Sequence, residues 1–312
     1  MSTFRKISSA PLGALAALAL AAPGAASACA CGCGVFDVAT SSLFPSGAHT
    51  TLFAQGGYID QTRNWSGTSS APAADNDDLH IRSSFYTAGV QTMFDRRWGL
   101  TVALPYTQRH VSAVDEDSGE IVRIDHGGIG DARVLATYTG FSPDLSSGLN
   151  FGVKLPTGDW NHAGLERDTQ IGTGTTDLLF GGFHRFGIDK DGRWSGFAQA
   201  DLDLPTRQRR GYRPGAELNG VLGAYPQGWQ LAPGVALTPV LEALLSVRRH
   251  DAGAEANTAD TGYERVLAAA GLDLRVRRMH FYADVEAPLY QRMRGNQLVA
   301  PWQMRFTASV DL

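Results

Sequence analysis

Three cysteines stand close together near the start of the chain. Cys29, Cys31 and Cys33 are the only cysteines among 312 residues, and they fall in the stretch "CACGCG". Closely spaced thiolates are soft ligands that suit copper, zinc or an iron–sulfur centre. A disulfide between two of them would be strained, because bridged Cα atoms usually lie about 4.4–6.8 Å apart. The segment therefore has four open interpretations: a soft-metal site, a redox-active or intermolecular disulfide, a lipid anchor on Cys29, or no chemical role.

Charged residues form a second group, because they alternate with apolar residues over long stretches. The stretch "ADLDLP" carries Asp201 and Asp203, and "ADVEAP" repeats the pattern with Asp284 and Glu286. Residues two apart in a β-strand point to the same face, so each pair of acids shares one face. Such a charged face could fill a protein interior as a network of salt bridges, or it could guide a polar solute.

Catalytic and nucleic-acid-binding patterns are not found. The eight histidines fall in no recognisable nucleophile motif, and the pairs Asp125–His126 and His250–Asp251 lie in predicted loops. Glycine-rich phosphate loops, CxxC pairs and basic nucleic-acid-binding stretches are also missing from the sequence. We expect no enzymatic activity and no nucleic-acid partner.

The first residues predict export. Arg5 and Lys6 precede an apolar stretch from Leu12 to Ala22, which ends before the small residues 26–28. This pattern is typical of a secretory signal peptide. We therefore assign residues 1–28 to a signal peptide, 29–47 to a cysteine-rich periplasmic segment and 48–312 to one folded domain.

The folded domain is predicted to be all-β. In "QMRFTASVDL" every second residue from Met304 to Leu312 is apolar, and this two-residue period is typical of a strand with two different faces. Short connections, such as residues 95–97 and 276–278, alternate along the chain with longer polar ones, such as 62–79, 112–128 and 291–300. Short turns on one side and long loops on the other are a feature of bacterial outer-membrane barrels. We predict a transmembrane antiparallel β-barrel of about twelve strands in the bacterial outer membrane, with both termini on the short-turn side.

A barrel in a bilayer fixes the direction of its charged side chains. A charge that faces lipid at mid-membrane costs about 2–4 kcal/mol, so the charged residues of the predicted strands should point into the lumen. The predicted lumen set consists of Arg133, Lys154, Arg185, Asp201, Asp203, Glu242, Arg248, Arg265, Asp273, Arg275, Asp284, Glu286, Arg305 and Asp311. The alternating apolar residues should face the lipid.

Aromatic residues and prolines support the predicted positions of the turns and strand ends. Six aromatic residues lie at or beside the predicted short turns, as expected for an interfacial girdle: Phe94, Trp98, Phe141, Phe186, Trp194 and Trp229. Five tyrosines lie toward the long loops: Tyr58, Tyr106, Tyr212, Tyr263 and Tyr290. A proline cannot donate to a strand ladder, so four prolines are interpreted as marks of bulges or strand ends: Pro105, Pro156, Pro205 and Pro288.

Three stretches resemble a known family. "GGIGDARVLATY" (127–138), "GVKLPTGDW" (152–160) and "GTGTTDLLFGGF" (172–183) are similar to the outer-membrane barrels encoded in meta-pathway phenol-degradation operons. Members of that family are described as transporters. The resemblance implies a membrane barrel or channel and assigns no catalytic residue; the cysteine-rich segment is not part of the family's pattern.

Taken together, these patterns favour a channel that lets a small-molecule solute cross a lipid bilayer. The alternative is an interaction barrel whose CxCxC segment binds a soft metal ion, copper or zinc, or an iron–sulfur centre, in the periplasm.

Overall fold

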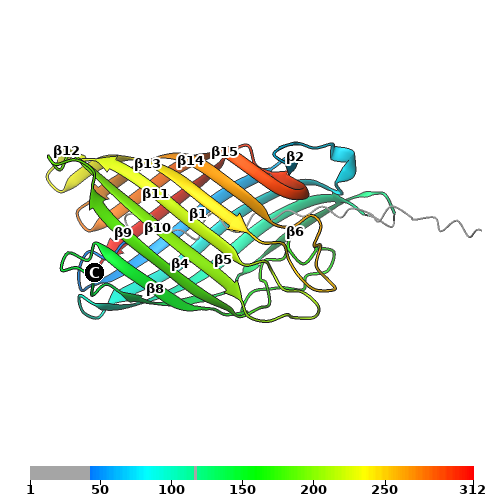
Figure 1. The fold of residues 1–312 in the computed structure, drawn as a ribbon, viewed down its shortest axis with the longest axis horizontal. Helices are drawn as coiled ribbons and strands as arrows, with labels where there is room; N and C mark the ends of the chain where they lie inside the picture. Colours follow the sequence, from blue (N-terminus) through cyan, green and yellow to red (C-terminus); the bar gives the residue numbers. More distant parts are fainter. Residues whose placement is uncertain (1–42, 116–117) are drawn as a thin grey trace, which may run out of the picture.

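The computed structural model describes residues 43–115 and 118–312, and their regular structure is almost entirely β (Figure 1). The strands are β1 (Thr50–Gln61), β2 (Arg63–Gly67), β3 (Ser69–Ser70), β4 (Asp78–Met93), β5 (Trp98–Val114), β6 (Ile121–Ile129), β7 (Arg133–Tyr138), β8 (Ser147–Lys154), β9 (Asp177–Gly187), β10 (Trp194–Pro205), β11 (Glu217–Pro226), β12 (Trp229–Ala232), β13 (Val235–Arg248), β14 (Tyr263–Val276), β15 (Met279–Val299) and β16 (Gln303–Asp311). A short 3-10 turn, η2 (Ala73–Asp75), follows β3. Among these described residues, no helix is long and apolar enough to cross a membrane.

Twelve of the described strands form a closed antiparallel ring, which confirms the predicted barrel. Its order is β1, β4, β5, β7, β8, β9, β10, β11, β13, β14, β15 and β16. The ring closes where β1 pairs with β16, from Thr51 opposite Asp311 to Ile59 opposite Gln303. Ring closure leaves no open sheet edge, which a bilayer requires because lipid offers no hydrogen-bond partner to the backbone.

The first strand begins and the last strand ends on the side of the short turns. The backbone N–H of Leu312 donates to the carbonyl oxygen of Thr50 at 2.9 Å. Thr50 also pairs with Thr92, next to the turn that joins β4 to β5. Figure 1 shows the chain end at the same end of the barrel as β12, opposite β2 and β6.

Several strands on the long-loop side are longer than the predicted ten residues. The predicted loop 112–128 contains most of β6, which pairs only with the outer half of β5. The predicted loop 291–300 is largely strand, because β15 runs to Val299 and its outer part pairs with β2. These predictions were wrong because each segment pairs with a neighbouring strand, β6 with β5 and the end of β15 with β2, and this pairing satisfies the backbone groups.

The four prolines lie at interruptions of the ladder, but two of them lie inside long strands. Pro288 is at a register shift between β14 and β15, and Pro105 is where β5 changes partner from β7 to β6. Pro205 is the last residue of β10, and Pro156 follows the end of β8.

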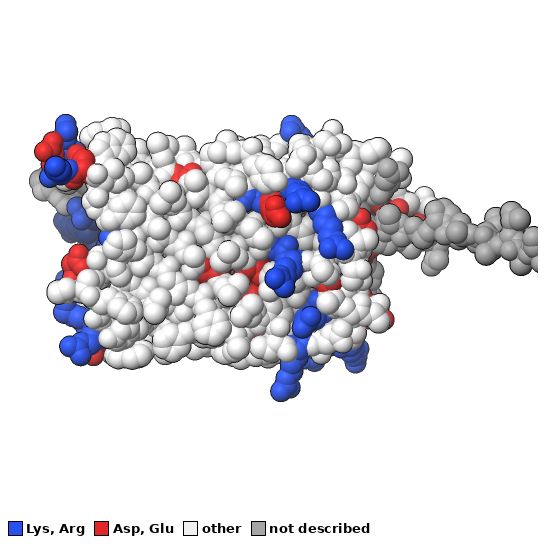
Figure 2. Space-filling view, viewed as in Figure 1, with Lys and Arg blue, Asp and Glu red and all other residues white. Residues whose placement is uncertain are grey.

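The outside of the barrel is apolar. Leu52, Leu100, Val102, Leu104, Phe151, Leu222, Leu241, Val285 and Phe306 are all exposed, whereas Val153 and Val310 are half-buried. Figure 2 shows a broad band with few charged side chains between the charged left end of the molecule and a second charged group right of centre. A surface of this kind is the one that a lipid bilayer covers.

The predicted girdle is exposed on the short-turn side. Phe94, Trp98, Phe141, Phe186, Trp194 and Trp229 all have large exposed fractions. On the long-loop side Tyr106 and Tyr290 are exposed, but Tyr212 and Tyr263 are buried. Tyr212 donates a hydrogen bond to Asp251, and Tyr263 donates one to Glu217 at 3.0 Å, so these two tyrosines do not belong to a lipid-facing girdle.

Glycines make room for large inward side chains on neighbouring strands. A Cβ atom on Gly271 would lie 2.7 Å from the hydroxyl oxygen of Tyr282, and one on Gly181 would lie 2.1 Å from a carboxylate oxygen of Asp201. A backbone oxygen also lies near each Cβ position, that of Ala283 at 2.8 Å and that of Ala200 at 3.0 Å, so a side chain at either glycine would require its neighbours to shift. The glycine content of the strands is therefore partly a packing requirement of a crowded lumen.

The facing of the strands gives a first testable prediction. Leu222 lies in the middle of β11 with 58% of its surface exposed, and Leu218 lies near the long-loop end of the same strand. We expect Leu222→Arg to lower the free energy of unfolding in liposomes by about 2–4 kcal/mol and Leu218→Arg by about 0–1 kcal/mol, because the cost of a lipid-facing charge depends on depth. Equal losses of stability in the two variants would contradict the assignment of the apolar outer surface around Leu222 to the middle of the membrane.

Candidate functional site

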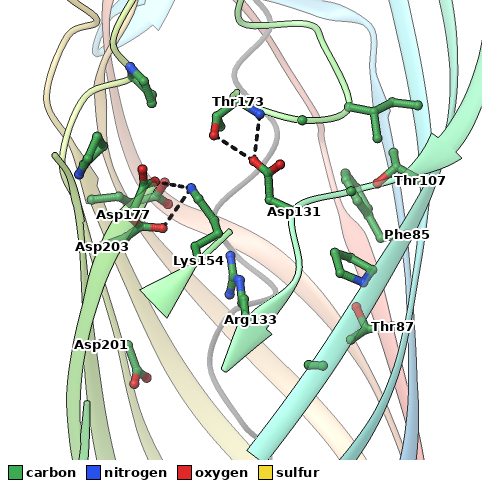
Figure 3. A pocket seen from close by; sticks show the side chains of 18 of the residues that line it. Phe85, Thr87, Thr107, Asp131, Arg133, Lys154, Thr173, Asp177, Asp201 and Asp203 are labelled. Carbon is green, nitrogen blue, oxygen red and sulfur yellow. Dashed lines mark hydrogen bonds and ion pairs between the residues drawn. The ribbon is translucent and has the colours of Figure 1, made fainter. Parts of the chain in front are cut away.

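A cavity of about 280 Å³ lies inside the barrel, under the long-loop side. Strands β1, β4, β5, β7, β8, β9, β10, β11 and β13 line it, together with the connections 130–132, 155–176 and 206–216 and the first described residue, Leu43. The two sides of the cavity differ in chemistry (Figure 3).

One side of the cavity is charged. The ammonium group of Lys154 on β8 forms ion pairs with Asp177 on β9 and with Asp203 on β10, the latter at 3.1 Å. Arg133 on β7 is directly opposite Lys154 in the β7–β8 register, and Asp201 lies two residues before Asp203 (Figure 3). Three carboxylates and two cations therefore line this side of the cavity. Their mutual pairing offsets the cost of removing each charge from water.

The other side is mostly uncharged, with the guanidinium of Arg109 at its outer end on β5. It consists of Gln55 on β1, Thr87 and Gln91 on β4, and Thr101 and Thr107 on β5, with the rings of Phe53 and Phe85 between them. Such a side can contact an apolar group while its amides and hydroxyls still offer hydrogen bonds. The cavity can therefore accept a molecule with both an apolar and a polar part.

Loop 155–176 covers the cavity and is fastened at two points. The carboxylate of Asp131 accepts hydrogen bonds from the backbone N–H of Gly158 at 3.0 Å and from the N–H and hydroxyl of Thr173 at 2.8 and 2.7 Å. The guanidinium of Arg109, which is 2% exposed, donates to the carbonyl oxygens of Thr169 and Gln170. Since these are charge-assisted bonds away from bulk water, they hold the loop against the barrel.

Two further loops interlock with loop 155–176. Tyr212 donates to a carboxylate oxygen of Asp251 at 2.6 Å, and Arg248 forms an ion pair with Asp251 at 2.7 Å. The guanidinium of Arg167 lies 4.8 Å from the ring centre of Trp160 and 4.7 Å from that of Tyr212. The long-loop end of the lumen is thus closed by contacts among loops 155–176, 206–216 and 249–262.

Asp168 lies inside this closed end and carries a shifted pKa. Burial of the carboxyl group, with a smaller contribution from the negative charge of Asp251, raises the pKa of Asp168 to about 7, while Arg248 acts in the opposite direction. The raised pKa means that the closed arrangement of the loops favours the protonated form of Asp168.

The short-turn half of the lumen is filled by an apolar cluster. Phe44 stacks on Phe183 with ring centres 4.8 Å apart and meets Phe197 edge-on at 5.6 Å. Val221, Val240, Leu244, Leu267, Ala269 and Tyr282 complete the cluster. Arg185 holds the same segment by donating to the carbonyl oxygen of Pro45 at 3.3 Å. Leu43 and Phe44, which precede β1, therefore lie inside the barrel.

Beside this cluster lies a buried ionic group centred on Arg305. Its guanidinium is 2.6 Å from a carboxylate oxygen of Glu242 and 2.5 Å from one of Asp284, and its Nε is 3.6 Å from Glu286. Tyr282 donates to Asp284 at 2.8 Å, and Gln303 donates to Glu286. One cation thus holds together three buried carboxylates from β13 and β15.

The structure places the predicted lumen residues as follows. Lys154, Glu242, Arg248, Arg265, Asp284, Glu286 and Arg305 are buried, and Arg133, Arg185, Asp201, Asp203, Asp273 and Asp311 are half-buried. Arg275 is exposed. It follows the inward alternation of β14, but it lies one residue from the short-turn end of the strand, where the lumen opens to water. The prediction that Arg275 is enclosed was therefore wrong.

Several residues of the site were missed in the sequence. Asp177 was overlooked although it is the first residue of β9 and shares the inward alternation with Leu179 and Phe183. Asp131, Arg167 and Asp168 lie in connections, where a two-residue period gives no signal. Cys29, Cys31 and Cys33, the predicted metal ligands, lie outside the described residues.

Comparisons with known proteins show the same fold. No known protein family and no curated protein matches the sequence. Among solved structures, the COG4313 outer membrane channel from Pseudomonas putida F1 has a TM-score of 0.64 at 12% identity, over 88% of this chain and 100% of that one. The beta domain of the Bordetella autotransporter BrkA has a TM-score of 0.49 at 14% identity, over 85% and 100%. A Pseudomonas aeruginosa FadL homologue has a TM-score of 0.42 at 10% identity, over 91% and 98%. The first of these shows that the chain has the fold of an outer-membrane channel.

The ionic group at Arg305 gives a stability prediction. Replacing Arg305 by Met would leave three buried carboxylates without their cation, which we expect to cost about 3–5 kcal/mol in the free energy of unfolding. Arg193→Met is the control, since Arg193 pairs with Asp189 and Asp191 on an exposed turn and exposed pairs contribute little. A stable Arg305→Met variant would show that the carboxylates do not depend on this cation.

The shifted pKa of Asp168 gives a pH prediction. An exposed aspartate loses its proton near pH 4, whereas Asp168 in the closed protein keeps it up to about pH 7. The closed state thus binds more protons than the open state between these values, so closure weakens as the pH rises.

We expect amide hydrogen exchange in loop 155–176 to increase by up to about tenfold per pH unit across that range, after correction for the intrinsic pH dependence of exchange. The Asp168→Asn variant should lose this dependence, and the turn 188–193 serves as an internal reference. The same pH dependence in wild type and variant would assign the effect to another group.

Proposed function

We propose that this chain is a channel of the bacterial outer membrane that lets small molecules cross through the barrel lumen. The observation that carries this proposal is the cavity of about 280 Å³ between a charged side and a polar side with two phenylalanines. Its volume is near the lower end of the range of about 300–1,000 Å³ that small-molecule sites occupy. The apolar outer surface supports the membrane location, and long loops on one side support an orientation with those loops outside the cell.

Both ends of the cavity are obstructed in this structure, so passage requires movement. Loop 155–176 closes one end through Arg109 and Asp131, and Phe44 with its aromatic neighbours fills the other. Phe183 and Phe197 belong to the ring strands β9 and β10, but loop 155–176 and Phe44 do not, so these two segments can move while the ring of strands stays closed. We therefore infer a channel that opens by displacement of these segments.

We further propose that the chain belongs to the family of outer-membrane barrels encoded in phenol-degradation operons. It is supported by the spatial relation of the three stretches that carry the resemblance, because they meet at the charged side of the cavity. Asp131 of the first stretch bonds to Gly158 of the second and to Thr173 of the third. Lys154 of the second forms an ion pair with Asp177 of the third. Stretches that build one site together are expected to share a functional constraint.

Single-channel recording in a planar bilayer tests the channel. We expect wild-type protein to show small or brief conductance steps and Phe44→Ala to show steps that are severalfold larger, because the variant removes a ring from the filled half of the lumen. Phe141→Ala removes a ring from the exposed surface and should behave as wild type. Absence of conductance in wild type and in Phe44→Ala would contradict the proposal.

The second candidate function is a soft-metal site at Cys29, Cys31 and Cys33. It is supported by the three alternating thiols and by Phe44, which attaches the chain that follows them to the lumen. Replacing all three cysteines by Ser separates the two functions: the channel proposal predicts unchanged conductance, and the metal proposal predicts loss of bound copper, zinc or iron in elemental analysis. Equal metal content before and after the replacement would remove the second candidate.

A further inference from the structure

A cluster of two imidazoles and a carboxylate lies on the long-loop side, outside the cavity lining. His126 is on β6, and Asp159 and His162 are on loop 155–176. One potential metal-binding atom from each residue lies within 4.8 Å of the other two. No other group of three such residues meets this distance in residues 43–115 and 118–312.

The distances in this cluster fit one ion. The Nε2 atom of His126 is 3.1 Å from Oδ2 of Asp159, and Nδ1 of His162 is 3.7 Å from the same oxygen. Zinc bound to nitrogen and oxygen ligands at about 2.1 Å in a tetrahedron has ligand atoms about 3.4 Å apart. The two measured separations lie on either side of that value.

One of the three ligand atoms is buried without a hydrogen bond to any described residue. Although His126 Nε2 is buried and close to Asp159, it has no partner in hydrogen-bonding geometry. The two imidazole rings stack with centres 3.7 Å apart and an angle of 23° between their planes. Ion binding would rotate the rings until both nitrogen lone pairs face the ion, and such a rotation needs only side-chain movement.

The backbone around the cluster is already held in place. Gln170 accepts a hydrogen bond from the N–H of His162 at 2.8 Å and donates to its carbonyl oxygen at 3.0 Å. The N–H of Gly172 donates to the carbonyl oxygen of Asp159 at 2.6 Å. Supporting contacts of this kind orient ligands and raise metal affinity.

Other histidine–aspartate pairs of the structure differ from this cluster. His80 with Asp60 and His110 with Asp125 are close pairs, but neither belongs to a group with a third potential ligand. Two imidazoles and one carboxylate form a mixed set that suits zinc and other first-row transition ions better than Ca²⁺ or Mg²⁺, which prefer oxygen.

We propose that His126, Asp159 and His162 form a binding site for a divalent transition metal ion, with Zn²⁺ as the occupant and water completing its coordination. The ion links loop 155–176 to β6, next to the place where Asp131 and Arg109 fasten the same loop to the barrel. The proposed ligands include none of the three cysteines, and the site does not depend on the channel proposal.

Calorimetric titration with Zn²⁺ tests the site. The full chain with Cys29, Cys31 and Cys33 replaced by Ser is used in detergent, so that thiolates cannot contribute. We expect one bound Zn²⁺ per chain, with affinity lowered about 100-fold or more in His162→Ala and in Asp159→Asn. His110→Ala removes a histidine from a simple pair on the adjacent strand and should leave affinity unchanged.

Spectroscopy with Co²⁺ in place of Zn²⁺ provides a second readout on the same proteins. We expect visible absorption bands of nitrogen- and oxygen-bound Co²⁺, without thiolate bands, in the cysteine-free chain and in His110→Ala, and their loss in His162→Ala. The absence of Zn²⁺ binding in the cysteine-free chain, or equal binding in His162→Ala and His110→Ala, would overturn the proposal.

Discussion

A lipid bilayer offers no hydrogen-bond partner to the backbone and no solvation to a charge, and the architecture of this protein follows from that constraint. Backbone groups must pair among the strands, so the sheet closes where β1 meets β16. Side chains of each strand then divide by alternation, with apolar residues toward lipid and charged residues toward the lumen. A narrow lumen must therefore hold many charges, which are stable there only when they are paired.

The lumen meets this requirement in two separate groups. Arg305 neutralises acids from β13 and β15, and Lys154 does the same for acids from β9 and β10. Inward glycines such as Gly181 and Gly271 create the space for these groups. Between the groups the interior is filled by the cluster around Phe44 at one end and left as a cavity toward the other. The lumen of the barrel is consequently only partly filled, and its empty part lies next to the long loops.

The long loops contribute the remaining contacts around the cavity. Asp131 and Arg109 fasten loop 155–176, and this contact brings together three segments that are separated in sequence but adjacent on the charged side of the cavity. Asp168 and the cluster of His126, Asp159 and His162 lie in or against the same loop. Loop 155–176 is therefore positioned to respond both to protonation of Asp168 and to binding of a metal ion at the proposed site.

The sequence by itself determined the fold class, the number of strands in the ring and the facing of most side chains. The two-residue period and the alternation of short and long connections are local signals in the sequence. Contact with lipid on one face of each strand requires the first, and the second is a general feature of outer-membrane barrels. Tertiary structure alone decided the rest. Tyr212, Asp251 and Asp168 meet through three loops without periodic pattern, and Phe44 enters the lumen from a segment before the first strand. The outer parts of β5 and β15 extend the barrel by pairing with β6 and β2. These contacts join residues far apart in the chain, and no local pattern encodes which partners they find.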